Sequence, residues 1–145
     1  MLKTYLDEWK AYPDLGKRTV CKVDAKKIFK KIKRHFKINA YVNFSPRMKD
    51  GYAFRNGKIL IGTHPSLVII AHELAHVLEY QKYGSTGHTK RFKKVMLKIV
   101  KYIRKKNYWE NNIVYTMELG YEDKIESIIL SYKLDKEANK ISNII

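Results

Sequence analysis

Apolar and polar residues follow two different periods along the chain, and each change of period marks an element boundary. Residues 1–20, which Pro13 and Gly16 punctuate, are expected to form a short helix and an irregular connection. A helical period in residues 24–36 gathers these apolar side chains on one stripe: Ile28, Phe29, Ile32 and Phe36. Asp24 has the side chain of a helix N-cap. Strict alternation in residues 40–44 then predicts a half-buried strand that ends at Ser45-Pro46.

A hairpin is predicted for residues 52–61, because Asn56-Gly57 is the preferred pair of a two-residue type I′ turn. The period changes again after residue 62. Pro65 suits the first position of a helix, and residues 66 to about 82 continue helically until Gly84.

A second amphipathic helix is predicted to start near His88 or Thr89. Its apolar residues recur every three or four positions: Phe92, Val95, Met96, Ile99, Val100 and Ile103. Residues 113–117 read as one more strand and residues 125–132 as a last helix. The predicted class is α+β: an N-terminal helix, a three-stranded, mostly antiparallel sheet and two further helices. We expect one domain over residues 1–145, with its core in about 22–106 and a C-terminal extension in 107–145.

The helix predicted for residues 66–82 contains His-Glu-Leu-Ala-His at residues 72–76. Side chains four apart lie one above the other on a helix, so His72 and His76 can bind one tetrahedral Zn²⁺. Glu73 lies beside such a metal, where it can accept a proton from a zinc-bound water and pass it to a leaving amine. The alternative is two incidental histidines, but the rest of this helix is apolar and imidazoles there need partners. The motif predicts a zinc hydrolase with Glu73 as catalytic base.

A catalytic zinc site needs a third protein ligand and a position for water. His88 is the leading candidate, since a glycine-containing turn after His76 lets the chain reverse toward the metal. Its alternative role is to cap the next helix. His35 is expected to be solvated in a lysine-rich helix, and His64 to lie at a helix start.

Residues 72–92, HELAHVLEYQKYGSTGHTKRF, resemble the SprT-like (Spartan-type) zinc metallopeptidases. The resemblance implies that His72, His76 and His88 are the three zinc ligands. It also implies that Glu73 is the general base and Phe92 a core aromatic residue. It covers roughly residues 24–105 and implies zincin-like architecture. It also implies a protein substrate, such as one crosslinked to DNA or bound on it.

A second resemblance concerns the C-terminal part of the chain. Residues 135–139, Asp-Lys-Glu-Ala-Asn, loosely match the gluzincin-type peptidases, in which an acidic residue on a later helix is the third ligand. That resemblance implies that Asp135, and not His88, is the third zinc ligand, and that the protein is a minimal gluzincin. Other acidic candidates are Glu118, Glu122 and Glu126. The alternative is that all four are surface charges on an ordinary helix.

Zincins commonly bind the substrate backbone as a strand added to a sheet edge, which by analogy falls within residues 51–62. Stabilisation of an oxyanion needs a hydrogen-bond donor, and Tyr115 and Tyr121 are both candidates.

Composition narrows the class of protein. The 145 residues are 45% hydrophobic and 12% aromatic, which is enough for one core and excludes a disordered basic tail. No apolar run is long enough to span a bilayer and no signal-like stretch opens the chain, so a cytoplasmic protein is expected. Cys21 is the only cysteine, which excludes an internal disulfide and the zinc ribbon of many SprT-like proteins.

The net charge of +16 is concentrated in two segments. Residues 22–37 hold eight Lys+Arg and one acid, and residues 82–106 hold ten and none. Such surfaces attract polyanions, so DNA is the expected partner besides a protein or peptide substrate. The alternative is a solvated lysine-rich surface.

Three functions therefore remain open from the sequence. The first is a SprT-like endopeptidase. The second is a peptidase held latent by one of its own ends, such as the net-negative residues 111–145. The third is a non-catalytic, zinc-containing module that binds nucleic acid.

Overall fold

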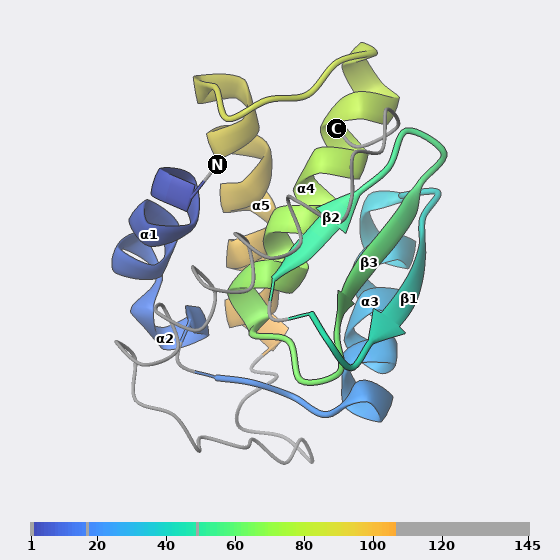
Figure 1. Ribbon diagram of the computed structural model, residues 1–145. Coiled ribbons are helices and arrows are strands. Elements are labelled where there is room, and N and C mark those ends of the chain that lie inside the picture. Colours follow the sequence, from blue (N-terminus) through green and yellow to red (C-terminus); the bar gives the residue numbers. More distant parts are fainter. Residues whose placement is uncertain (1, 17, 49, 107–145) are drawn as a thin grey trace.

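Helix α4 (Leu67–Tyr83) is the element around which the others pack (Figure 1). The computed structural model describes residues 2–16, 18–48 and 50–106. Within these residues the chain forms, in order, α1 (Leu2–Ala11), α2 (Pro13–Gly16), α3 (Lys22–Phe36), β1 (Tyr41–Ser45), β2 (Gly51–Ala53), β3 (Lys58–Gly62), α4 and α5 (Lys90–Lys106). The predicted α+β class is confirmed.

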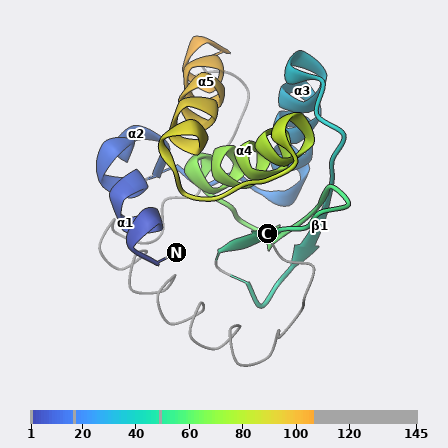
Figure 2. The ribbon, with the colours of Figure 1, turned by 90° about the horizontal axis from the view of Figure 1, so that it is seen from above.

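In the part of the chain that the structure describes, the strands form one sheet of three, and helices pack against it. Seen from above, α3, α4 and α5 lie on one side of the sheet, and α4 packs on β2 (Figure 2). Helices α1 and α2 lie beside α4 and α5, at the end of the molecule away from β1. The sheet and α4 thus form the part of the fold that positions the histidine motif.

The sheet is mixed, so the prediction of a mostly antiparallel sheet is wrong. The strand order is β1-β3-β2, with β3 parallel to β1 and antiparallel to β2. Alternation along the chain predicts the strands, but it carries no information on which strands become neighbours. Val42 and Phe44 of β1 are half-buried against the core, as the alternation predicts.

The predicted hairpin is present, but its turn is not type I′. That turn needs a positive φ at both central residues, and here Gly57 has φ 91° while Asn56 does not have a positive φ. The N–H of Gly57 donates to the carbonyl of Phe54 at 3.0 Å, and the N–H of Phe54 donates to Lys58 at 2.9 Å. This is the pattern of a longer hairpin loop in which only the last residue is left-handed.

Two helix starts differ by a few residues from the prediction. Helix α3 begins at Lys22 with Cys21 as N-cap, and Asp24 lies in its first turn, where a carboxylate is also favourable. Helix α4 is capped by Ser66, whose Oγ accepts the N–H of Ile69 at 3.2 Å, so Pro65 lies before the cap. The predicted end is confirmed, since Gly84 is the left-handed C-cap.

The core is built from both faces of α4 and one face of α5. Every residue of α4 from Leu67 to Val77 is buried, which leaves no solvent-exposed face on this stretch of the helix. The predicted stripe of α5 is confirmed, because all of its members are buried: Phe92, Val95, Met96, Ile99, Val100 and Ile103. Any polar side chain on the buried part of α4 therefore needs a partner inside the protein.

Some predictions lie outside the described residues. These are the strand at 113–117, the helix at 125–132 and the extension from 107 onward. Among helices α1 to α5, none has the length and apolarity needed to cross a membrane.

Two glycines with positive φ offer a matched test of this fold. A Cβ on Gly57 would meet the backbone carbonyl oxygen of Asn39, whereas one on Gly84 (φ 76°) would meet nothing within 4 Å. Gly57→Ala should therefore lower the free energy of unfolding by more than about 2 kcal/mol, and Gly84→Ala by only about 1 kcal/mol. Urea unfolding measures both values. Equal losses would contradict the close approach of the hairpin to residue 39.

Candidate metal centre

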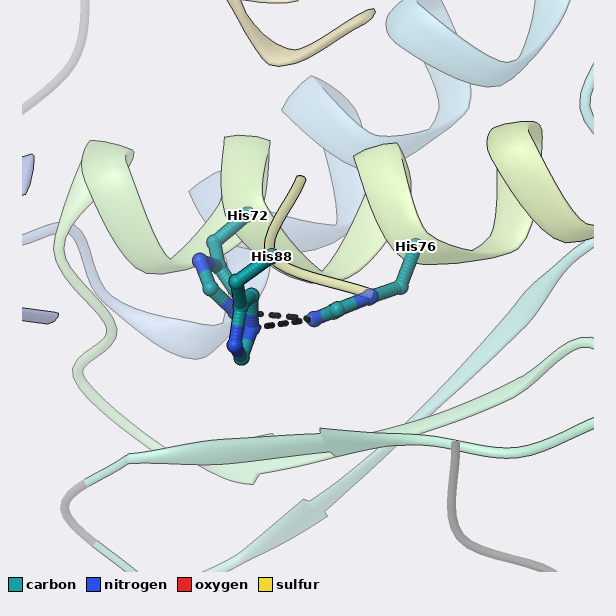
Figure 3. A group of neighbouring side chains, drawn as sticks. All are labelled: His72, His76 and His88. Atoms are coloured by element: carbon teal, nitrogen blue, oxygen red, sulfur yellow. Dashed lines mark hydrogen bonds between the residues drawn. The ribbon is translucent and has the colours of Figure 1, made fainter. Parts of the chain in front are cut away.

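Three histidine side chains meet at one point beside α4 (Figure 3). His72 and His76 project from the same side of α4, one turn apart, and His88 reaches them from the segment before α5. The Nε2 atom of His76 lies 3.0 Å from Nε2 of His72 and 3.1 Å from Nε2 of His88. The candidate residues predicted from the sequence are thus brought together.

The loop that carries His88 is fixed by a buried acid on α4. Glu79 is fully buried and accepts the N–H of Gly87 at 3.2 Å and the Nε of Arg91 at 2.9 Å. Arg91 in turn donates to the carbonyl and hydroxyl oxygens of Ser85, at 3.2 and 2.9 Å. Because these contacts hold both ends of residues 85–91, the position of the His88 backbone is set by α4 itself.

Two of the imidazoles are oriented through their other ring nitrogen. Nδ1 of His72 lies 2.5 and 2.9 Å from the carboxylate oxygens of Glu8, and Nδ1 of His76 lies 2.9 Å from the hydroxyl of Thr86. In the tautomer in which Nδ1 donates to these oxygens, each Nε2 presents a lone pair to the meeting point.

Burial keeps the three imidazoles neutral. Removal from water lowers the pKa of His72 to about 3, that of His76 to about 2 and that of His88 to about 4. Neutral imidazole is the form that binds metals, so none of the three rings has to lose a proton near pH 7.

An aromatic side chain closes one side of the histidine cluster. The ring of Phe92 is fully buried, and its centroid lies 5.1, 4.5 and 5.3 Å from those of His72, His76 and His88. Phe92 is therefore a core aromatic residue, and it also limits how far the imidazoles can turn.

Two carboxyl groups flank the cluster. An oxygen of Glu73 lies 3.8 Å from Nε2 of His72, and the Glu73 side chain is buried. Burial, with a contribution from the carboxylate of Asp7, raises the pKa of Glu8 to about 8. Negative charge on these groups is favoured by a nearby cation, so the surroundings suit a divalent metal ion.

The donor set fits such an ion. Ligand atoms that lie about 2.0–2.1 Å from one tetrahedral ion lie about 3.3 Å from one another. The Nε2 atoms of His72 and His88 lie 3.0 and 3.1 Å from that of His76, which is close to this value. Within the described parts of the chain, the group that can hold a metal consists of these three residues. Three protein ligands leave a coordination position for a further molecule.

The other histidines take no part in the cluster. His35 is exposed and stacks on Tyr102 with ring centroids 4.2 Å apart, and His64 is exposed beside Thr63. The remaining candidates lie outside the described residues: Tyr115, Tyr121, Glu118, Glu122, Glu126 and Asp135.

Sequence reasoning missed four residues that support the site: Glu8, Glu79, Thr86 and Arg91. Glu8 lies 64 positions before His72, and nothing in the local pattern marks it. Glu79 and Arg91 could have been found from the sequence. Glu79 follows His76 by three residues on an apolar helix, so its buried carboxylate needs a cation such as Arg91.

Comparisons with models of protein families, with curated proteins and with solved structures find no match to this chain. The resemblance to SprT-like peptidases therefore depends on the motif residues alone.

Substitution of each candidate ligand tests the metal centre. Loss of a hydrogen-bond partner of a ligand weakens metal binding roughly 10- to 100-fold. His88→Ala removes a candidate ligand itself and should therefore weaken zinc binding by more than that. Competition with a chromophoric chelator measures the affinity, and the wild-type protein should bind one ion per chain. His35→Ala is the matched control and should bind as the wild type does. If Asp135→Asn abolished binding and His88→Ala did not, the third ligand would be the C-terminal acid.

Proposed function

We propose that the protein is a zinc-dependent metallopeptidase of SprT-like type. The observation that carries this proposal is the convergence of three neutral imidazole Nε2 atoms with the carboxyl group of Glu73 beside them. His72, His76 and His88 would hold the ion. A zinc ion held there supplies Lewis-acid activation of water and of a peptide carbonyl.

Glu73 has the position of a general base. Its carboxylate can take one proton from the attacking water as the oxygen–carbon bond forms, and can return that proton to the amine as the carbon–nitrogen bond breaks. Burial beside the imidazoles suits both steps, because the group is held in place and shielded from bulk water. The balance is one water consumed for each peptide bond broken.

The sheet edge next to Glu73 suits an extended substrate. Strand β2 lies at the edge of the sheet and packs on α4. Its first residue, Gly51, approaches Glu73 so closely that a Cβ there would lie 2.9 Å from Glu73 Cγ. A peptide added to this edge by backbone hydrogen bonds would therefore pass close to the proposed base.

Glu73→Gln separates chemistry from metal binding. The amide has the same shape but takes up no proton, so cleavage of an unfolded protein should fall by at least about 100-fold. Zinc affinity should stay near the wild-type value, because Glu73 is not among the proposed ligands. Gel analysis of the substrate and chelator competition measure the two quantities.

Asp7→Asn, which neutralises an exposed carboxylate on α1, is the control and should cleave as the wild type does. Full activity of Glu73→Gln, or no cleavage by the zinc-loaded wild type, would contradict the peptidase and favour a non-catalytic role.

We also propose DNA as a partner, on the basis of one surface of the molecule. Helices α3 and α5 meet near their C-terminal ends, where His35 and Phe36 contact the ring of Tyr102. Both helices lie on the same side of the sheet (Figure 2). Each carries exposed cations: Lys27, Lys30, Lys31, Arg34, Lys94, Lys98, Lys101 and Lys105. Phosphates neutralise such a surface whatever the base sequence.

Salt dependence tests this partner. For a short DNA duplex, the logarithm of the binding constant should fall linearly with the logarithm of the salt concentration, by about 0.9 per phosphate contacted. Replacement of Lys98 and Lys101 by Gln should make that slope shallower by about 2, as measured by fluorescence anisotropy. The pair Lys10→Gln and Lys58→Gln, on α1 and β3, is the control. Binding that is absent, or independent of salt, would contradict the proposal.

A further inference from the structure

Helix α1 brings a carboxyl group to the metal centre from outside the histidine motif. Both oxygens of Glu8 lie within hydrogen-bond distance of Nδ1 of His72, at 2.5 and 2.9 Å. Only 8% of Glu8 and 1% of His72 is exposed, so solvent has little access to this contact. The two residues are 64 positions apart, and their contact ties the N-terminal helix to α4.

The helix is held in place by contacts that do not involve Glu8. Trp9 is fully buried in the core, and Gly16 packs beneath its ring, where a Cβ would lie 3.1 Å from Cε3. The carboxylate of Asp14, on α2, receives two hydrogen bonds from Arg104 of α5, at 2.9 and 3.0 Å. These anchors fix the position of residue 8 independently of its side chain, so a substitution there need not undock the helix.

The contact has a specific consequence for a metal ligand. An imidazole that binds through Nε2 carries its proton on Nδ1, and a carboxylate at Nδ1 fixes the ring and raises its basicity. At the equivalent atom of His76, the described partner is the neutral hydroxyl of Thr86. Glu8 is thus the carboxyl group that contacts and orients one of the three candidate ligands.

We propose that Glu8 is a positioning residue of the metal centre, through which docking of helix α1 and metal binding stabilise each other. The proposal rests on the metal site of the proposed function, and it does not require peptidase activity. Such coupling is reciprocal. The free energy by which docked α1 strengthens metal binding equals the free energy by which bound metal strengthens the docking of α1.

The test compares Glu8→Ala and Glu8→Gln with Lys10→Gln, which removes an exposed charge from the same helix. Chelator competition should show zinc binding about 10- to 100-fold weaker for Glu8→Ala, with a smaller loss for Glu8→Gln. Lys10→Gln should stay within about 2-fold of the wild type. The visible spectrum of the Co²⁺-loaded protein should change in the Glu8 variants alone, because their His72 is no longer held in one orientation.

A second measurement separates positioning from a merely structural role. Hydrogen exchange at the amide of Tyr12, which bonds to the carbonyl of Glu8 at 2.8 Å, reports the stability of α1. Zinc should slow this exchange in the wild type and in Lys10→Gln, and should slow it much less in Glu8→Ala. If Glu8→Ala proves unstable without metal, Glu8→Gln carries the comparison.

The outcomes are distinct. Wild-type affinity, cobalt spectrum and zinc-dependent exchange in both Glu8 variants would overturn the role of Glu8. Failure of the wild type to bind zinc would overturn this role and the metal centre together. Zinc binding that depends on Glu8, without any peptide cleavage, would support the role of Glu8 and contradict the peptidase.

Discussion

Three imidazoles that meet beside the buried part of α4 govern how the elements around this helix are placed: Nε2 of His76 lies 3.0 Å from that of His72 and 3.1 Å from that of His88. Burial holds the rings neutral, and neutral rings this close need a shared partner to satisfy their lone pairs. A divalent cation is such a partner. The helix spacing of His72 and His76, the left-handed turn at Gly84 and the loop that returns His88 all serve to place these atoms together.

Polar groups on the buried helix α4 are compensated by side chains from other elements. Glu8 of α1 contacts His72, and Arg91 of α5 pairs with Glu79 at 2.9 Å. Removal of one member of such a pair leaves a buried polar group without its partner, which costs more than the contact itself contributes. The contacts that orient the histidines of α4 therefore also fix the position of this helix in the fold. As a result, the stability of the protein and the geometry of the site are coupled.

Local periodicity explains which features could be predicted from the sequence. The pair His72 and His76, the buried stripe of α5 and the stop at Gly84 depend on residues within a few positions of one another, and the structure contains all of them. The parallel pairing of β1 with β3 and the contact of Glu8 with His72 could not be predicted in this way. Both depend on how distant elements pack, and the pattern of a single strand or helix is the same whichever neighbour it acquires.

We infer that His72, His76 and His88 hold one metal ion and leave a position for a further ligand. X-ray absorption at the zinc edge of the zinc-loaded protein tests it most directly, because it reports the type, number and distance of the ligand atoms. Three imidazole nitrogens at about 2.0–2.1 Å and one oxygen ligand that is not part of an imidazole are expected. Two imidazoles with carboxylate oxygens as the other ligands, or a sulfur ligand at about 2.3 Å, would contradict it.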